Sequence, residues 1–243
     1  MKALVLAAGY GTRMQHVGGG LPKPLLPVGG QPVIDYLFDQ LAALDGLDEA
    51  LVVTNDLHYE QFAQWSSCAC CTGIRLLNDG TRCNEERRGA VGDLQFAIES
   101  AALDDDLLVA GGDNIFRFQI ASLVTFFREK GADVIAVLHE SRPERLVRSS
   151  TLRLDEVGRV TAFAEKAPTP LSDLICPPLY IFRRETLPRV QEYLTTGGSS
   201  DAPGHFIEWL HRETTVYGFL APEGRFDIGS PESYREACEL LGD

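Results

Sequence analysis

Long apolar runs are absent from this sequence. Of its 243 residues 44% are hydrophobic, yet no stretch approaches the ~20 consecutive apolar residues that cross a bilayer. Within the first eight residues the apolar run covers only residues 3–8, which is shorter than the ~7–15-residue core of a signal peptide, and it runs into Gly-Tyr-Gly-Thr-Arg. We therefore expect a cytoplasmic protein with no membrane partner. Length and hydrophobic content suit a single α/β domain spanning residues 1–243.

Basic side chains are also scarce. The chain has 22 Lys and Arg against 35 Asp and Glu, which gives a formal net charge of −13. Nucleic acids and anionic membranes bind to basic faces, so this balance argues against both as partners. A small polyanion can still bind in a locally basic pocket. Self-association into a homo-oligomer is left open.

Paired metal-binding motifs are missing. Cys68, Cys70, Cys71 and Cys83 cluster, and the first and third of these have the spacing of half a zinc site, but no second Cys-x-x-Cys follows. The five histidines show no metal-ligand pairing. We expect ordinary thiols of a reducing cytoplasm, with a structural metal as the less favoured alternative.

The first part of the chain carries the pattern of a phosphate-binding loop. An apolar run predicts a buried strand that ends at Ala8, and Gly9 and Gly11 let the backbone turn sharply and direct its N–H groups at phosphate oxygens. Arg13 and Lys23 add positive charge. The loop has neither the Gly-Lys-Ser/Thr end of a Walker A motif nor the third glycine of a dinucleotide fingerprint.

Strand and helix patterns alternate along the first half. Such alternation predicts a parallel sheet covered on both faces, with ligands bound at the carboxyl ends of the strands. The expected strands are residues 3–8, 50–54, 74–77 and 107–110, and the expected helices lie around residues 33–44, 59–65 and 91–101. Pro32 suits the first residue of the first of these helices.

The second half has a mixed α+β pattern. Residues 151–154 and 160–164 flank Asp-Glu-Val-Gly and predict a hairpin, and residues 197–200 form a candidate mobile loop. Further strands are expected at residues 134–138, 179–182 and 216–220, and helices at residues 120–130, 185–194, 205–212 and 231–241.

The opening motifs resemble those of the sugar-phosphate nucleotidyltransferases, and most closely the glucose-1-phosphate thymidylyltransferase type. They are Leu6-Ala7-Ala8-Gly9-Tyr10-Gly11-Thr12-Arg13, then Pro22-Lys23-Pro24 and Gln31-Pro32-Val33-Ile34. The resemblance implies a Rossmann-like three-layer α/β fold with a mostly parallel central sheet and an α+β substrate-binding part. It further implies catalytic roles for Arg13 and Lys23, and nucleotide contacts from Leu6, Ala8, Gly9, Gly11, Thr12, Arg13 and Gly89.

Two acidic motifs extend the resemblance. Asp113 follows an apolar strand and two glycines, and Asp227 lies in Arg-Phe-Asp-Ile-Gly-Ser-Pro, and both are similar to the family's metal ligands. Two carboxylates completed by phosphate oxygens and water suit Mg²⁺, the implied cofactor. Glu165-Lys166 resembles the family's Glu-Lys-Pro motif, with one inserted residue. The implied acceptor-binding residues are Lys23, Glu165 and Lys166.

The resemblance implies nucleotidyl transfer from a nucleoside triphosphate to a sugar 1-phosphate. A phosphate monoester has a second pKa near ~6, so its oxygen is already a nucleophile at neutral pH. The nucleobase stays open because residues 78–94 do not match the thymidylyltransferase pattern. Three alternatives also remain: a cytidylyltransferase acting on a phosphoalcohol such as phosphocholine, a glycosyltransferase, whose Asp-x-Asp strand end is missing, and a non-catalytic ligand-sensing relative.

Overall fold

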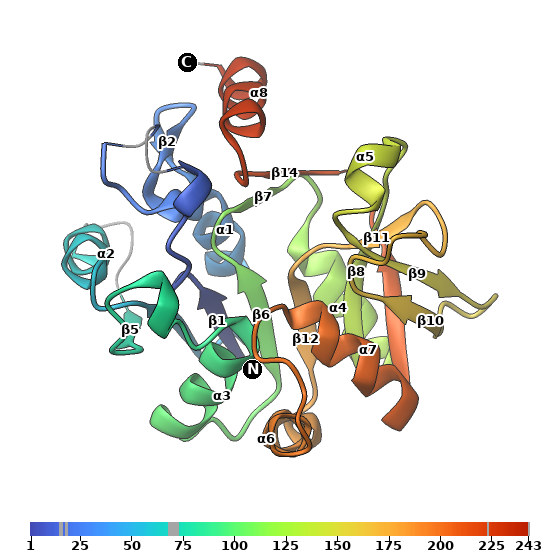
Figure 1. Cartoon of the computed structure of the whole chain (residues 1–243). Helices are drawn as coiled ribbons and strands as arrows, with labels where there is room; N and C mark the ends of the chain where they lie inside the picture. The colour runs from blue at the N-terminus through green and yellow to red at the C-terminus, as the bar shows by residue number, and fades with distance from the viewer. Residues whose placement is uncertain (15–16, 18, 68–72, 223, 243) are drawn as a thin grey trace.

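A computed structural model describes residues 1–14, 17, 19–67, 73–222 and 224–242, which are arranged around one large sheet (Figure 1). In the first half of the chain the strands are parallel and alternate with helices, as expected. The strands are β1 (Lys2–Leu6), β4 (Glu49–Thr54), β5 (Ile74–Asn78) and β6 (Leu107–Gly111), in the spatial order β5-β4-β1-β6. The helices between them are α1 (Val33–Ala42), α2 (Tyr59–Ser66) and α3 (Ala90–Ser100).

The second half continues the same sheet with mixed pairing. The strand β12 runs antiparallel to both β6 and β8, and the predicted hairpin is confirmed as β9 and β10. The bounds are β8 (Asp133–His139), β9 (Ser150–Leu154), β10 (Val160–Ala164), β11 (Leu174–Cys176), β12 (Leu179–Phe182), β13 (Val216–Leu220), α4 (Ile120–Lys130), α5 (Pro143–Leu146), α6 (Leu187–Thr195) and α7 (Pro203–Glu213). The predicted α/β fold class is confirmed.

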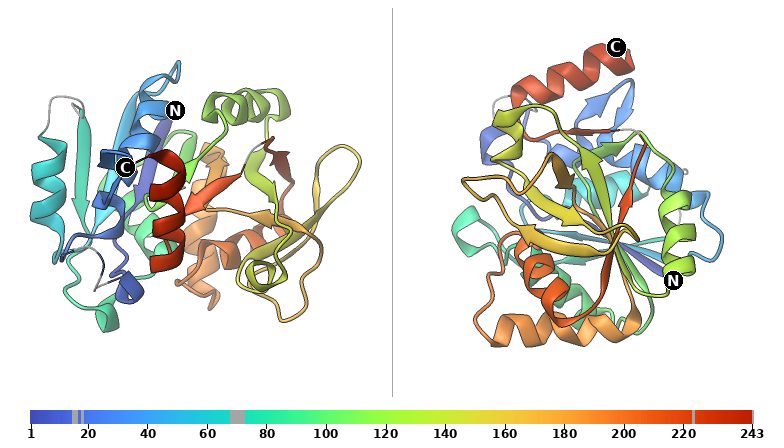
Figure 2. Two further views of the ribbon diagram at one scale, coloured as in Figure 1. Left: turned by 90° about the horizontal axis from the view of Figure 1, so that it is seen from above. Right: turned by 90° about the vertical axis from the view of Figure 1, so that its right-hand side faces the viewer.

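Two hydrophobic cores cover the two faces of the sheet. One core packs α3, α6 and α7 against it, with Phe182 and Phe206 among the buried side chains. The other packs α1, α2 and α4, with Phe62 and Leu108 fully buried. The views in Figure 2 show these helices on opposite sides of the strands. The three-layer arrangement leaves the carboxyl ends of the parallel strands free for ligands.

Short strands and the last helix close over that edge. The small sheets pair β2 (Pro27–Val28) with β3 (Gln31–Pro32) and β7 (Asn114–Phe116) with β14 (Arg225–Asp227). Helix α8 (Pro231–Leu241) begins with a capping box at Ser230 and packs Ala237 on a third core formed by these segments. Figure 1 shows α8 above β14, at the rim of the molecule.

Some local expectations need correction. Pro32 precedes α1 as its N-cap rather than serving as its first residue, because Gln31 and Pro32 pair with β2. The mobility expected of segment 197–200 stays a prediction, and at its end the Ser200 carbonyl accepts a hydrogen bond from Val91 N–H at 2.9 Å. Cys68, Cys70 and Cys71 lie outside the described residues, whereas Cys83 is a free thiol.

The described helices include none with the length and apolarity needed to span a bilayer.

Candidate active site

The glycine loop leaves the sheet at the carboxyl end of β1. Ala7 N–H still donates to the Val53 carbonyl at 2.9 Å, after which Gly11 adopts φ +55° and Met14 N–H donates to its carbonyl at 2.7 Å. Met14 is buried and anchors the turn, while Gly9, Thr12 and Arg13 remain exposed. Predicted nucleotide-binding residues thus line an open loop, with Leu6 and Ala8 at its base.

Lys23 crosses this loop. It begins a short 3₁₀ turn whose Pro24 and Leu25 are buried, and its aliphatic chain lies against Gly11. A Cβ on Gly11 would stand 3.3 Å from Lys23 Cγ, so a side chain there would press on the lysine. Lys23 Nζ lies 3.4 Å from Asp113 Oδ2. The structure therefore brings the glycine loop, the Pro-Lys-Pro motif and the first acidic motif together.

Asp113 is held where β6 ends. Gly112 N–H donates to the Leu6 carbonyl at 3.0 Å, and the Asp113 carbonyl accepts from Ile228 N–H at 3.0 Å. Its carboxylate accepts from Asn114 Nδ2 at 2.9 Å. Main-chain contacts on both sides thus fix the direction of this carboxylate.

Asp227 stands beside Asp113 because β14 pairs with β7. The register places Asp227 opposite Asn114, and Ile228 then bonds Asp113. Burial raises the pKa of Asp113, the Lys23 cation opposes that rise, and the Asp227 charge adds to it. The two predicted carboxylates therefore share one electrostatic site, although their motifs are more than a hundred residues apart.

Arg225 is a site residue that the sequence analysis did not identify. Its side chain is only 14% exposed, donates to Asn114 Oδ1, and has Nη2 3.5 Å from Asp227 Oδ2. A signal was available, because residues two apart on a strand share a face and Arg225 stands two before Asp227. Arg225 also places a cation beside both carboxylates.

Glu165 and Lys166 lie at the end of β10. The Glu165 carboxylate is 4% exposed, accepts from the Ser150 hydroxyl and lies 3.1 Å from Lys166 Nζ. Gly204, in the first turn of α7, leaves room for that carboxylate, which a Cβ would overlap. Lys166 has φ +46°, an uncommon conformation for a residue with a side chain, and is 57% exposed. The lysine therefore extends outward from a buried acid.

Buried groups connect the Glu165 end with the Asp113 end. Burial raises the pKa values of Cys176 and Tyr180, the Glu165 charge raises them further, and Arg225 opposes the rise. The pKa values of both residues are therefore affected by Glu165 of one motif and by Arg225 of the other. The predicted acceptor-binding residues and the carboxylate pair border one region of the sheet edge.

Gly89 begins α3 with φ +80°, and the chain itself approaches it closely. A Cβ there would lie 2.3 Å from the Ser200 carbonyl oxygen. Ala90 N–H donates to the Asp201 carbonyl and Val91 N–H to that of Ser200, both at 2.9 Å. Ser200 and Asp201 therefore cap the helix. A base contact at Gly89 stays a prediction.

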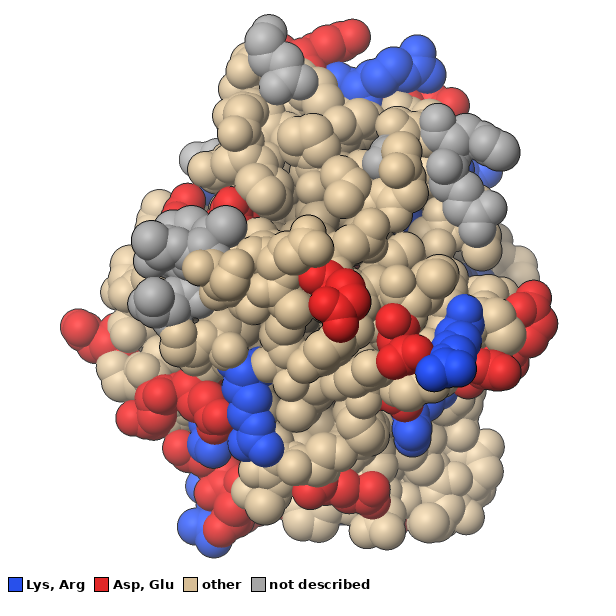
Figure 3. Space-filling model, turned by 90° about the vertical axis from the view of Figure 1, so that its left-hand side faces the viewer, with Lys and Arg blue, Asp and Glu red and all other residues tan. Residues whose placement is uncertain are grey.

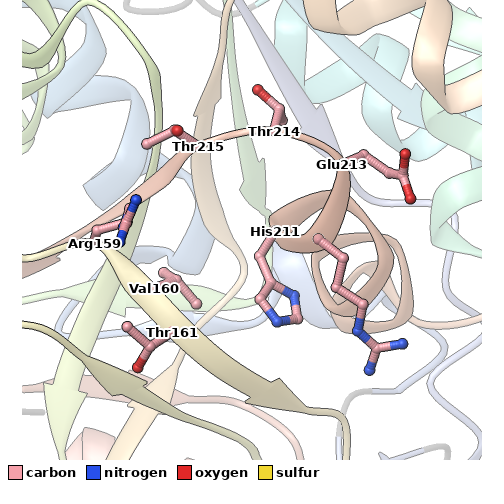
Figure 4. A pocket seen from close by; sticks show the side chains of 8 residues that line it. Arg159, Val160, Thr161, His211, Glu213, Thr214 and Thr215 are labelled. Atoms are coloured by element: carbon pink, nitrogen blue, oxygen red, sulfur yellow. The ribbon is translucent and has the colours of Figure 1, made fainter.

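The described cavities lie away from these residues. A hollow of about 460 Å³ is lined from the start of β10 and the end of α7, with His211 facing Val160 and Thr161 (Figure 4). Another, of about 380 Å³, contains Asp133 and Arg183 near the amino end of β8. Both border Thr214 and Thr215, which precede β13. None of the predicted site residues lines either one.

The face that carries α2 and β5 shows acidic and basic side chains in mixed groups on a largely uncharged surface (Figure 3).

Among the described residues, there is no group of three or more His, Cys, Asp or Glu side chains arranged to hold a metal ion. A metal at the Asp113 and Asp227 pair would therefore need substrate oxygens and water as its remaining ligands.

Known proteins resemble this chain along its whole length. A protein of Sulfolobus acidocaldarius, provisionally named a mannose-1-phosphate guanyltransferase, is 30% identical over 99% of this chain and 63% of its own length. The UTP–glucose-1-phosphate uridylyltransferase of Haloferax volcanii is 27% identical over 99% of this chain and 96% of its own. The chain thus spans less than two thirds of the first relative and nearly all of the second.

A solved structure shares the fold. A Bacillus anthracis protein, provisionally named a glucose-1-phosphate thymidylyltransferase, superposes with a TM-score of 0.83 at 20% identity, over 100% of this chain and 96% of that one. The family described as "Nucleotidyl transferase" matches residues 2–243. With the glycine loop, the lysine that crosses it and the paired carboxylates in place, this match shows that the chain belongs to the nucleotidyl transferase family.

Proposed function

We propose that this protein transfers a nucleotidyl group from a nucleoside triphosphate to a sugar 1-phosphate, with Mg²⁺, forming a nucleotide-diphosphate sugar and pyrophosphate. One observation carries the proposal. Lys23 passes Gly11 and reaches Asp113, which joins a loop suited to a triphosphate to a carboxylate pair suited to a metal. The names of the relatives, which refer to glucose 1-phosphate and mannose 1-phosphate, support a sugar 1-phosphate as the acceptor.

The carboxylate pair fits a divalent cation. Asp113 and Asp227 offer hard oxygen ligands, and burial together with the neighbouring Asp227 charge raises the pKa of Asp113, a rise that Lys23 opposes. A bound Mg²⁺ would neutralise charge on the phosphates during transfer. Arg225, fixed on Asn114, would hold the Asp227 carboxylate toward the shared site.

The remaining residues have separate tasks. The backbone of Gly9 to Thr12, exposed at both ends and partly exposed between them, would receive the triphosphate, and Arg13 would balance the charge that develops as pyrophosphate leaves. Lys23 and Lys166 would bind the acceptor phosphate, which already carries a nucleophilic oxygen at neutral pH. Glu165 would accept hydrogen bonds from acceptor hydroxyls.

The position of the acidic triplet argues against a glycosyltransferase. Asp104 to Asp106 precede β6 and therefore lie at its amino end, opposite to Asp113. Arg184 forms two hydrogen bonds with Asp104, at 2.6 and 2.7 Å, and its N–H donates to Asp106. The carboxylates of Asp104 and Asp106 thus accept hydrogen bonds from Arg184 of the same chain, at the end of the strand away from the candidate site.

A substrate panel tests the proposal. The protein would be incubated with Mg²⁺, each nucleoside triphosphate, and glucose 1-phosphate, mannose 1-phosphate or phosphocholine, with pyrophosphate release as the readout and mass spectrometry to identify the product. We expect one nucleotide with a sugar 1-phosphate to give a nucleotide-diphosphate sugar. Turnover with phosphocholine alone, or no turnover with any pair, would contradict the proposal.

A further inference from the structure

Two aspartates are buried behind the glycine loop. Asp79 follows β5 and is 2% exposed, and Asp93 lies in the first turn of α3 and is 6% exposed. Their side chains are within hydrogen-bonding reach of each other. Buried carboxylates are uncommon unless they are paired with a cation or well hydrogen-bonded.

The partners of the two carboxylates are unequal. Asp79 Oδ1 accepts from Thr81 N–H at 2.7 Å and from the Thr81 hydroxyl at 2.8 Å. Asp93 Oδ1 is buried and has no hydrogen-bond partner among the described residues. An ionised carboxylate with one buried oxygen unpartnered and a second carboxylate beside it would be strongly disfavoured there, whereas a protonated one can donate to Asp79.

The network reaches the glycine loop. The Tyr10 hydroxyl, between Gly9 and Gly11, donates to Thr81 Oγ1 at 2.8 Å. Thr81 then donates its own hydroxyl proton to Asp79. Each bond in this chain therefore joins one donor to one acceptor. Tyr10 donates to Thr81, Thr81 donates to Asp79, and a protonated Asp93 can donate to Asp79 from the other side. The chain of bonds joins α3, the end of β5 and the loop that follows β1.

We propose that Asp93 is a positioning residue: its neutral carboxyl donates to Asp79 and, through Thr81 and Tyr10, fixes the glycine loop in the conformation that receives the triphosphate. This role rests on the proposed function, because the proposed reaction is what requires the loop to bind a nucleotide. It adds a proton-dependent support to the glycine loop.

The charges around Asp93 agree with a retained proton. Burial raises its pKa to about 8, the Asp79 carboxylate adds to the rise through its charge and hydrogen bond, and Arg88 opposes it. Arg88 Nε donates to the Asp79 main-chain carbonyl at 3.0 Å, and the guanidinium group lies over the Phe96 ring. Around Tyr10, burial raises the hydroxyl pKa, and the charges of Asp79, Cys83 and Glu86 also raise it. We therefore expect the network to be intact at neutral pH and to lose the Asp93 proton as pH rises through about 8.

Nucleotide affinity as a function of pH tests the role. Nucleoside triphosphate binding would be measured by calorimetry from pH 6.5 to 9 for the wild type, Asp93→Asn and Asp93→Ala. We expect the wild type to lose roughly tenfold affinity above pH 8, the effect of about one hydrogen bond. Asp93→Asn, a permanently neutral donor, should bind like the wild type at pH 7 and keep that affinity at pH 9. Asp93→Ala should bind weakly at every pH.

Thermal unfolding without nucleotide tests the proton independently of any activity. An acid whose folded pKa is raised makes the protein less stable as pH rises from about 4 to about 8, because the unfolded chain ionises first. The melting temperature of Asp93→Asn relative to the wild type should therefore be higher at pH 8 than at pH 5. Failure of the substrate panel would leave this result intact, so the two proposals can fail separately.

Two further variants complete the test. Tyr10→Phe cuts the chain of bonds at its far end and should weaken nucleotide binding at every pH while the ligand-free pH dependence stays that of the wild type. Asp133→Asn, at a buried aspartate near the opposite edge of the sheet, is the control and should leave the alkaline loss of affinity unchanged. If the wild type and Asp93→Asn lose affinity in parallel above pH 8, or if Tyr10→Phe binds nucleotide normally, the positioning role is wrong.

Discussion

Single side chains at the candidate active site differ in how firmly they are held. Asp113 is fixed by Asn114 and by main-chain bonds on both sides, and its side chain is 31% exposed. The Asp227 side chain is 52% exposed and forms an ion pair with Arg225. The first carboxylate is therefore preorganised, and the second can adjust to a ligand.

Loss of either carboxylate should remove metal-dependent activity. We expect Asp113→Asn and Asp227→Asn to slow turnover by on the order of 10²–10⁴, because a neutral amide is a poor ligand for a divalent cation. Calorimetric titration with Mg²⁺ should show weaker binding in both. Asp104→Asn, at the opposite edge of the sheet, is the matched control and should keep wild-type turnover. Near-normal rates in the site variants would remove the metal assignment.

Lys166 should serve the acceptor and not the nucleotide. Lys166→Ala is expected to weaken sugar 1-phosphate binding by roughly 1.5–3 kcal/mol, the range of a charge-assisted hydrogen bond, with nucleotide affinity little changed. Separate calorimetric titrations measure the two affinities. Arg159→Ala removes a comparable exposed ion pair, with Asp155, and should change neither. An unchanged acceptor affinity in Lys166→Ala would make Lys166 a surface residue.

Arg13 is expected to act on the chemical step. Its exposed side chain follows the glycine loop. In the proposed reaction, negative charge would grow there as the phosphorus–oxygen bond breaks. Arg13→Ala should therefore lower kcat more than it raises the KM for nucleotide. Steady-state kinetics with saturating acceptor measure both constants. A larger change in KM than in kcat would identify a residue that only binds nucleotide.

At the scale of elements, the start of α3 is joined to the segment before α7. The carbonyls of Ser200 and Asp201 accept from the first N–H groups of α3, which have no partner within the helix. Gly89 allows this approach because it has no Cβ and a positive φ. Two segments more than a hundred residues apart are thereby locked behind the site.

Gly89→Ala should break this junction. The substitution adds a Cβ 2.3 Å from a carbonyl oxygen and also strains φ, so we expect a loss of about 2–4 kcal/mol in the free energy of unfolding, measured with urea. Gly158→Ala is the matched control, since φ is +83° and the nearest atom is 3.6 Å away. It should lose only about 1–2 kcal/mol. Equal losses would show that the close approach to Ser200 contributes nothing.

At the scale of the whole molecule, the two edges of the sheet have different tasks. The carboxyl ends of the parallel strands carry the candidate active site. Near the other edge, the buried Asp133 accepts from Arg183 N–H and from the Thr186 hydroxyl, and so ties the end of β12 to the start of β8. This edge serves stability.

Asp133 should make global stability depend on pH. Burial raises its pKa to about 6, and the hydrogen bonds from Arg183 and Thr186 oppose the rise. Because the unfolded carboxyl ionises near ~4, its contribution to stability falls as pH rises from about 4 to about 6, by up to ~3 kcal/mol, and is constant above. Urea unfolding of the wild type and Asp133→Asn at pH 4.5 and 6.5 measures the difference. Asp93 acts equally in both proteins, so parallel slopes would contradict the assignment.

Much of the fold could be predicted from the sequence because its signals are local. Apolar runs and helical periodicity placed the strands of the parallel half within about two residues. One failure was at Pro32, which pairs with β2 and therefore precedes α1. The contact of Ser200 and Asp201 with the start of α3 has no local signal, because the two segments are more than a hundred residues apart. The metal and substrate roles of Asp113, Asp227, Glu165 and Lys166 stay predictions.

The sequence by itself determined the order of the longer strands and helices, the family and the chemical type of each motif, since these depend on periodicity and on residue identity. It did not indicate the short elements β2, β3, β7, α5, β11 and β14. Only the tertiary structure decided which side chains meet. Strand pairing brings Arg225 to Asn114 and Ile228 to Asp113, and burial turns Asp79 and Asp93 into a pair behind Tyr10. Proximity and desolvation arise from packing between segments far apart in the chain, and no local pattern encodes them.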